Sequence, residues 1–267
     1  MINKLKNFFG LKTLPFSKHI CVNELFRTSA ITEISDRIHF SLENEDFFLI
    51  TGAAGSGKST SLRYAVAQID PGAFPYVYIT AENYKIGDIA KLFLSDLKYS
   101  PPYNGYKALN IMKKTVSALG KEKNQKPILI IDEAQALPVP TLVSIKNIVN
   151  FDMDSKSRIL IILCGQYELL NKIKSYSLES LRRRIRMHYK IEPLSVEECS
   201  KYISFQTKSA GVDRKLYPEE AIAEIFRISK GNICNINNIC FELLLQAATS
   251  SMDVIEMSLF DKIILPA

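Results

Sequence analysis

The feature that most constrains this chain is an eight-residue stretch, Gly52-Ala53-Ala54-Gly55-Ser56-Gly57-Lys58-Ser59, which matches the pattern G-x-x-x-x-G-K-[ST] in full. An apolar run over residues 46–51 precedes it and predicts a buried strand, and a helical pattern over residues 60–69 follows it. A loop between such a strand and helix turns its backbone N–H groups inward, towards phosphate oxygens at the positive end of the helix. The motif therefore predicts a nucleotide-phosphate site rather than a turn without chemical consequence.

Two side chains of this loop have an expected role in binding ATP. We expect Lys58 to reach the β- and γ-phosphates and the Ser59 hydroxyl to ligate Mg²⁺. The residues expected to bind the nucleotide are Gly52, Ala53, Ala54, Gly55, Ser56, Gly57, Lys58, Ser59, Thr60 and Asp132.

A second motif supplies the acids that this chemistry needs. Residues 127–131 form an apolar strand that ends in Asp132 and Glu133. We expect Asp132 to complete the Mg²⁺ shell with Ser59, and Glu133 to orient or deprotonate the attacking water. Two carboxylates at the end of a strand can also cap a helix, but together with the loop they favour hydrolysis over nucleotide binding alone.

Gln166 is the third candidate for the catalytic site. It follows the apolar run over residues 159–164 after a single glycine, Gly165, so it is expected at the same edge of a sheet as Glu133. A polar side chain there can touch the γ-phosphate or the lytic water. The alternative is a glutamine that faces a turn.

The order of elements predicts the fold class, an α/β fold in which helices cover both faces of a parallel sheet. An apolar, loop-like lead-in and a helix over residues 22–43 open the chain. Strands are expected at 46–51, 76–80, 128–131 and 159–164, and helices at 60–69, 86–97, 106–119 and 140–150. After Pro193 only helices are predicted, at 196–210, 218–229, 233–250 and 257–263. We therefore expect a lead-in and helix (1–45), a P-loop ATPase core (46–192) and a small helical lid domain (193–267).

The positive charge is concentrated in three segments. The 267 residues carry a net charge of +6, yet residues 171–190 alone hold seven Lys or Arg against one acid. Residues 101–130 hold six lysines against one acid, and the first twenty residues hold four lysines and no acid. Such clusters can be solvated faces, but three of them favour a polyanionic partner such as nucleic acid.

Apolar runs and cysteines indicate the compartment. The longest apolar runs are far shorter than the ~18 residues of a membrane span, and no signal-peptide pattern opens the chain. The five cysteines form no C-x-x-C pair, which fits free thiols in a reducing cytosol. We expect a cytoplasmic protein without a membrane partner.

The motifs together resemble those of AAA+ ATPases, in particular the ExeA-like, TnsC/TniB and IstB-like helper ATPases. The opening Phe9-Gly10-Leu11 and Pro15-Phe16 is similar to the F-G-L-x-x-x-P-F start of ExeA-like proteins. Residues 132–135 (D-E-A-Q), 165–169 (G-Q-Y-E-L) and 181–185 (L-R-R-R-I) resemble further motifs of the group, in the same order. The resemblance implies an AAA+ fold with a helical lid.

The resemblance also implies a homo-oligomer, a ring or helical filament with ATP between subunits. A neighbouring subunit would supply an arginine to the γ-phosphate, where a cation stabilises the charge of the transition state. Arg184 is the first candidate for this role and Arg182 the second. The alternative is that these arginines contact DNA phosphates or face solvent.

One position departs from the family pattern. Cys234 stands where the group's lid carries a sensor arginine, and Ile233 replaces the preceding proline. Because a cysteine cannot contact phosphate as a cation, the resemblance implies slow hydrolysis and an ATP-bound state that persists.

For the biological role, the resemblance favours a transposition helper ATPase that assembles on duplex DNA when ATP is bound and recruits a transposase or adaptor. The expected DNA contacts, transferred from the group, are Lys85, Asn104, Tyr106 and Lys107, which would follow the phosphate backbone without base specificity. The chain ends at Ala267 without the membrane span and periplasmic region of ExeA-like secretion ATPases. The alternatives are a cytoplasmic ATPase that energises assembly of an envelope or secretion complex, and a nucleotide switch or small-molecule P-loop kinase.

Overall fold

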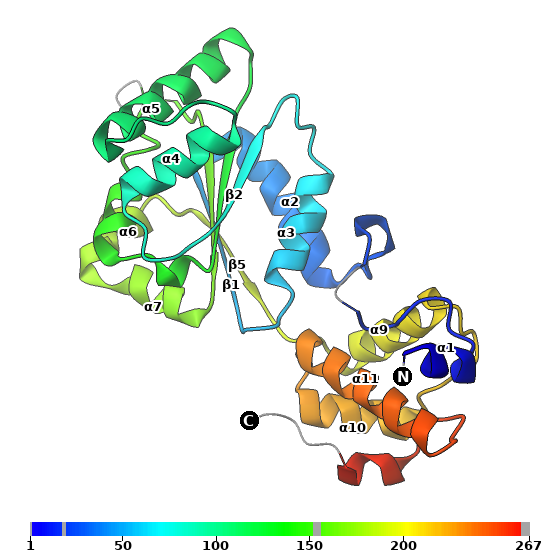
Figure 1. The fold of residues 1–267 in the computed structure, drawn as a ribbon. Helices are drawn as coiled ribbons and strands as arrows, with labels where there is room; N and C mark the ends of the chain where they lie inside the picture. The colour runs from blue at the N-terminus through cyan, green and yellow to red at the C-terminus, as the bar shows by residue number, and fades with distance from the viewer. Residues whose placement is uncertain (1, 18–19, 152–155, 263–267) are drawn as a thin grey trace. The chain divides into compact units, whose positions relative to one another are not determined.

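A computed structural model describes residues 2–17, 20–151 and 156–262 of the chain (Figure 1). The chain divides into two compact units. One comprises residues 30–54 and 58–191 and contains the sheet. The other comprises residues 1–29, 55–57 and 192–267 and is helical.

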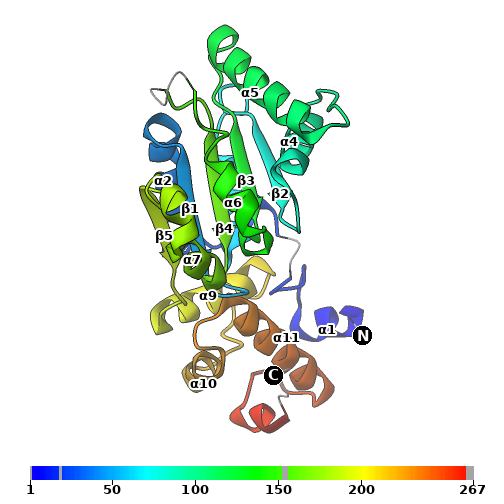
Figure 2. The ribbon, with the colours of Figure 1, turned by 90° about the vertical axis from the view of Figure 1, so that its left-hand side faces the viewer.

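The sheet unit is built on five parallel strands in the order β2-β3-β4-β1-β5. Figure 2 looks onto one face of this sheet. The strands are β1 (Phe47–Gly52), β2 (Tyr76–Thr80), β3 (Ile128–Asp132), β4 (Leu160–Gly165) and β5 (Met187–Ile191). Every residue of β1, β3 and β4 is buried, as expected for central strands of a parallel sheet that is covered on both faces.

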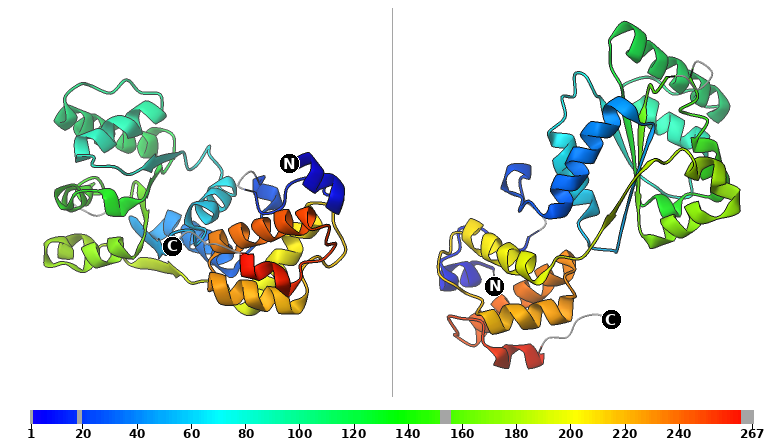
Figure 3. Two further views of the ribbon diagram at one scale, coloured as in Figure 1. Left: turned by 60° about the horizontal axis from the view of Figure 1, so that its bottom comes forward. Right: turned by 180° about the vertical axis from the view of Figure 1, so that it is seen from behind.

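Helices cover both faces of the sheet, which confirms the predicted fold class (Figure 3). One face carries α2 (Ser29–Asn44) and α3 (Lys58–Ala67). The opposite face carries α4 (Ile86–Asp96), α5 (Gly105–Glu122), α6 (Val139–Ile145), α7 (Tyr167–Lys174) and the short α8 (Glu179–Arg182). Alternate residues of the central strands point to opposite faces, so Ile130 packs under α2 and α3 whereas Ile131 packs under α4 to α8.

The helical unit contains α1 (Ile2–Phe9), α9 (Val196–Ser209), α10 (Glu219–Ser229), α11 (Ile233–Thr249) and a final 3₁₀ turn, Met257–Lys262. Ser195 caps α9, because its side chain accepts from Glu198 N–H while the Glu198 carboxylate accepts from Ser195 N–H. The buried Tyr217 hydroxyl donates to the Cys240 carbonyl at 2.7 Å, which ties the segment before α10 to α11. Within the described residues, no helix has the length and apolarity to cross a membrane.

Four segments differ from the sequence-based expectation. Residues 2–9 form a helix instead of a loop-like lead-in, because Leu5 and Phe9 are buried in the core of the helical unit. The helix predicted over residues 22–43 begins only at Ser29. Strand β5 was not predicted, and the last predicted helix, at 257–263, is a 3₁₀ turn as far as the structure describes it. Residues 1–45 are shared by the two units, since residues 1–29 pack with the C-terminal helices and residues 30–45 belong to the sheet unit.

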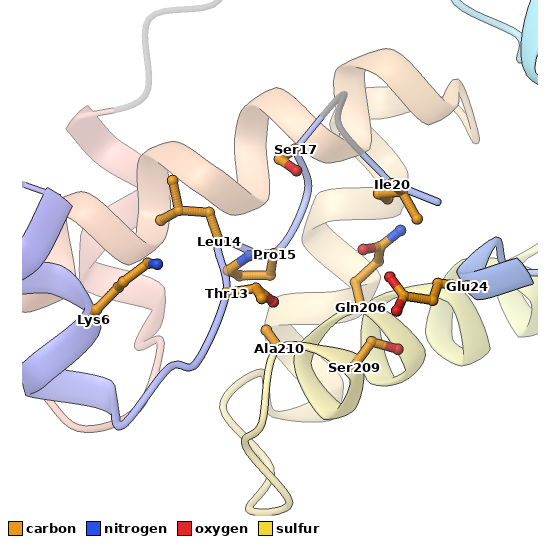
Figure 4. A pocket seen from close by; sticks show the side chains of 10 residues that line it. All are labelled: Lys6, Thr13, Leu14, Pro15, Ser17, Ile20, Glu24, Gln206, Ser209 and Ala210. Carbon is orange, nitrogen blue, oxygen red and sulfur yellow. The ribbon is translucent and has the colours of Figure 1, made fainter. Parts of the chain in front are cut away.

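The segment after α1 encloses a pocket of about 320 Å³ against α9. In Figure 4, Gln206 of α9 and Glu24 extend into the same space, and Thr13 and Pro15 lie opposite. The lead-in therefore forms one wall of a pocket in the helical unit that is lined by both polar and apolar side chains.

Candidate active site

The phosphate-binding motif joins the end of β1 to the start of α3, as predicted. Gly55 and Gly57 have φ angles of +73° and +91°, the left-handed region that favours glycine. Lys58 is the first residue of α3 and is only 5% exposed. The tight turn and the helix start that a phosphate cradle needs are therefore both present.

The ammonium group of Lys58 points back at its own loop. Its Nζ donates to the Gly52 carbonyl at 3.1 Å and to the Ala53 carbonyl at 2.9 Å. A buried charge is stable only when it is paired or hydrogen-bonded, and two neutral carbonyls compensate it less well than phosphate oxygens would. Lys58 is thus held at the loop in a position suited to an anionic ligand.

Asp132 brings the two halves of the site together. The Ser59 hydroxyl donates to Asp132 Oδ2 at 2.7 Å, which joins the residues predicted to hold Mg²⁺. The Tyr78 hydroxyl, from β2, donates to the same oxygen at 2.6 Å. Asp132 Oδ1 accepts from the Glu133 N–H at 2.9 Å, so the whole carboxylate is fixed.

The surroundings of Asp132 keep its neighbours protonated. Burial, and then the hydrogen bond to Asp132, raise the pKa of Tyr78 to about 12. Burial and the charge of Asp132 also raise the pKa of the Cys164 thiol well above its usual range. Both groups stay neutral near neutral pH, and the Tyr78 phenol remains a hydrogen-bond donor.

Glu133 and Gln166 lie side by side at the same edge of the sheet. Gln166 Nε2 is 3.3 Å from Glu133 Oε2, a distance that allows a hydrogen bond. Glu133 has a left-handed backbone, with φ of 53° and ψ of 33°, a conformation that is uncommon for residues other than glycine. Gln135, absent from the predicted site, also donates to Glu133 Oε2.

The base of the loop is fixed by a contact between neighbouring strands. The Thr51 hydroxyl lies 2.8 Å from His188 Nε2. This contact joins β5 to the end of β1, at the residue before Gly52. Burial lowers the pKa of His188, and Lys174, Arg37 and Lys190 lower it further. The imidazole therefore favours its neutral form beside the loop.

These groups fit a magnesium nucleotide. Mg²⁺ is held in nucleotide sites by one or two protein oxygens together with phosphates and waters. Ser59 and Asp132 offer such oxygens within hydrogen-bonding distance of each other, next to the buried cation of Lys58. Glu133 and Gln166 stand close by as polar groups that can bind a water molecule.

The comparison with protein families agrees with this geometry. Residues 41–173 match the AAA domain family, and this range includes the loop, both acids and Gln166. Residues 41–173 form an AAA domain. The predicted AAA+ fold is confirmed, whereas membership of the TnsC- or IstB-like group remains a prediction.

Similar proteins include one secretion pathway protein and two ORC proteins of known structure. The chain is 27% identical over 244 residues to general secretion pathway protein A of Aeromonas hydrophila, covering 90% of this chain and 44% of that protein. The chain thus spans less than half the length of this relative. Aeropyrum pernix ORC2, as ADPNP–ADP complexes, matches with a TM-score of 0.68 and 17% identity over 92% of this chain and 70% of that one. Aeropyrum pernix ORC1 in complex with DNA matches with a TM-score of 0.65 and 11% identity over 90% and 65% of the two chains.

The two predicted arginine fingers follow the AAA domain. Arg182 is the last residue of α8 and is exposed, and Arg184 is half-buried between α8 and β5. Their neighbour Arg183 is paired with Glu179 at 2.6 Å. A role on the nucleotide of another subunit stays a prediction.

The four predicted DNA contacts come together within the AAA domain. Lys85 precedes α4, and Asn104 caps α5 by accepting from the Lys107 N–H at 3.1 Å. The two helix starts touch, because a Cβ on Gly87 would lie 2.6 Å from Gly105 Cα. Lys85, Asn104, Tyr106 and Lys107 are all exposed, and they lie at these adjacent helix N-termini.

Sequence reasoning missed Tyr78, Gln135 and His188. Tyr78 and His188 act through neighbouring strands, so only the sheet order reveals their contacts. Gln135 could have been noticed as the fourth residue of the D-E-A-Q motif. Its hydrogen bond to Glu133, however, was not evident from the spacing of the residues.

Proposed function

We propose that the AAA domain binds ATP with Mg²⁺ at the loop Gly52–Ser59 and hydrolyses it with Glu133 as the base. The observation that carries this proposal is the Ser59–Asp132 hydrogen bond of 2.7 Å, which places a Mg²⁺-ligating hydroxyl against a buried carboxylate. The buried Lys58 beside it supports phosphate binding. The remaining nucleotide contacts would come from the loop backbone and Thr60.

Binding would rearrange the loop in a simple way. Lys58 would exchange the carbonyls of Gly52 and Ala53 for β- and γ-phosphate oxygens, which are better partners for its charge. Ser59 would turn its hydroxyl oxygen towards the metal, which it would hold together with Asp132. Bound Mg²⁺ supplies neutralisation of the charge on the phosphates.

Hydrolysis would depend on Glu133 and Gln166. Glu133 would accept a proton from the attacking water, and Gln166 would help to orient that water or the γ-phosphate. A neighbouring subunit would contribute Arg184 or, as second choice, Arg182. With Cys234 in place of a lid arginine, turnover would be slow.

The purpose that we propose for this cycle is to energise assembly of an envelope or secretion complex. The support is the similarity to general secretion pathway protein A, which extends over 90% of this chain. In this proposal the ATP-bound oligomer holds partner proteins together and hydrolysis releases them.

A second candidate is DNA binding, favoured by the cluster at the starts of α4 and α5. Tyr106 is 74% exposed beside Lys107, and Tyr103 is 98% exposed with Lys91 5.5 Å from its ring centre. Exposed lysines, aromatic rings and two adjacent helix N-termini suit a phosphate backbone. As a transposition helper, the chain would assemble on duplex DNA and recruit a transposase.

Phosphate release tests the ATPase proposal. The wild-type protein with Mg²⁺ and ATP should release phosphate slowly, and Lys58→Ala should lose both ATP binding and release. Lys114→Ala, which changes an exposed lysine of α5 outside the loop, is the matched control and should behave as the wild type. Equal activity of Lys58→Ala and wild type would contradict the proposal.

Two further measurements separate the candidate purposes. Replacing the gene in its source cell by the Lys58→Ala form should reduce protein secretion if the chain energises a secretion complex. If the second candidate is correct, anisotropy of a labelled random duplex should rise only with a non-hydrolysable ATP analogue, and Lys85→Glu with Lys107→Glu should abolish the rise. Lys201→Glu with Lys208→Glu, two exposed lysines of α9, is the charge-matched control.

A further inference from the structure

Gln135 connects the proposed base to the strand beside it. Its Nε2 donates to Glu133 Oε2, and its Oε1 accepts from the Gln166 N–H at 3.1 Å. One amide therefore bridges β3 and β4 at the point where both strands end.

The bridge uses only one oxygen of the Glu133 carboxylate. Gln135 and Gln166 both donate to Oε2, and no other side-chain bond to Glu133 is present in the part of the chain that the structure describes. With Oε2 held by two amides, Oε1 is left to accept a hydrogen bond from water. This arrangement fixes the direction in which the carboxylate presents its second oxygen.

Gly165 makes room for the bridge. A Cβ at this position would collide with Gln135 Oε1 and would lie 2.9 Å from Leu169 Cδ2. The last residue of β4 therefore has to lack a side chain if the Gln135 amide is to reach the Gln166 N–H. The hydrogen bonds of Gln135 therefore depend on the absence of a side chain at Gly165.

Lys172 fixes the main chain of Gln135. From α7, its Nζ donates to the Gln135 carbonyl at 2.5 Å and to the Leu137 carbonyl at 3.3 Å. A charged donor on two carbonyls holds this turn more firmly than neutral bonds would. The backbone that carries the Gln135 side chain is therefore anchored independently of Glu133.

We propose that Gln135 is a positioning residue that orients Glu133 for ATP hydrolysis and couples its orientation to Gln166. The inference rests on the proposed function, in which Glu133 is the base. Because Gln135 contacts Glu133 and is not among the residues proposed to bind the nucleotide, its loss should lower kcat and leave nucleotide affinity unchanged. A role confined to the stability of the turn would lower the melting temperature and leave kcat unchanged.

The test compares three substitutions that disturb the bridge differently. Gln135→Met keeps the length of the side chain but removes both hydrogen bonds, and Gln135→Glu places a second carboxylate against Glu133. Gly165→Ala leaves Gln135 in place but crowds its amide. Gln68→Ala, an exposed glutamine on the other side of the sheet, is the control.

Steady-state kcat and KM, the Kd of a fluorescent ADP and the melting temperature are measured for each protein. Misplacement of a catalytic group by about 1 Å costs up to roughly 100-fold in rate, so kcat should fall about 10- to 100-fold in all three variants. The Kd of ADP should stay within about two-fold of wild type. In a Glu133→Gln background, Gln135→Met should cause no further loss, because the residue then has no base to position.

The failures are distinguishable. A wild-type protein without hydrolysis would remove the proposed function and this inference together. A wild type that hydrolyses ATP and loses activity in Glu133→Gln, but keeps it in Gln135→Met and Gly165→Ala, would overturn the inference alone. A faster rate in Gln135→Met would also overturn it, since Gln135 would then restrain Glu133 rather than position it.

Discussion

The Tyr78 hydroxyl donates to Asp132 Oδ2 at 2.6 Å, on the same carboxylate oxygen that accepts from Ser59. Tyr78 lies on β2, where it is in register with Ile130 of β3, two residues before Asp132 on the same face. The proposed metal ligand is therefore oriented from the neighbouring strand as well as from the phosphate loop.

Tyr78→Phe should weaken the response to Mg²⁺. Loss of a hydrogen bond to a charged group costs about 1.5–3 kcal/mol, so the Mg²⁺ concentration for half-maximal ATPase activity should rise by up to roughly 10- to 100-fold. The rate at saturating Mg²⁺ should change little. Tyr76→Phe, two residues earlier on the same exposed face of β2, is the control. An unchanged Mg²⁺ titration for Tyr78→Phe would contradict the role of the phenol.

Gly87→Ala should destabilise the AAA domain. Its new Cβ would lie 2.6 Å from Gly105 Cα, so the starts of α4 and α5 must separate. Overpacking of this kind costs about 1–3 kcal/mol of the free energy of unfolding. Thermal or urea unfolding measures the loss.

Gly120→Ala is the matched control in α5. Its Cβ would lie 3.4 Å from Nη1 of Arg158, the far end of a flexible side chain. Because alanine favours a helix interior over glycine by about 0.5–1 kcal/mol, this variant should equal or exceed the wild type in stability. Equal stability of the two variants would argue against the tight contact at Gly87.

Lys126 should make stability depend on alkaline pH. Its Nζ donates to the Ser157 hydroxyl at 2.7 Å and to the Glu45 carbonyl at 3.1 Å. Burial lowers the pKa of Lys126 from 10.5 to about 8, although Asp46 and Glu45 act in the opposite direction. Between these two values the unfolded chain binds the proton and the folded chain does not, so the free energy of unfolding rises with pH.

The contribution of Lys126 is measured as a difference between two proteins. Below pH 8 both states are protonated and this group adds no slope. Above pH 8 the wild type should gain up to about 1.4 kcal/mol per pH unit relative to Lys126→Met. Urea unfolding at several pH values shows the difference, with the exposed Lys123→Met as control. Parallel profiles for wild type and Lys126→Met would contradict the burial of this charge.

The central fold was predictable because its strands are short apolar runs that end in motifs. Residues 128–131 and 159–164 are apolar throughout and are buried. Asp132 follows the first run directly, and Gln166 follows the second after Gly165. Strand β5 was missed for the opposite reason. It lies at the sheet edge, where His188 and Lys190 are exposed, so its sequence shows a basic cluster and no apolar run.

Residues whose role depends on a contact with a neighbouring strand could not be predicted from the sequence. Tyr78 needs the β2–β3 register, and Gln135 needs the empty space at Gly165. Helix α1 was missed because eight residues give a weak periodic signal, and its contact with α11 joins opposite ends of the chain.

The most direct test of the account is the nucleotide that remains on Glu133→Gln after incubation with ATP and Mg²⁺. The variant keeps Lys58, Ser59 and Asp132, so it should bind ATP as tightly as the wild type. The nucleotide bound to Glu133→Gln should be recovered as intact ATP, whereas the wild type should yield ADP. Recovery of ADP from Glu133→Gln at the wild-type rate would contradict the assignment of Glu133 as the base.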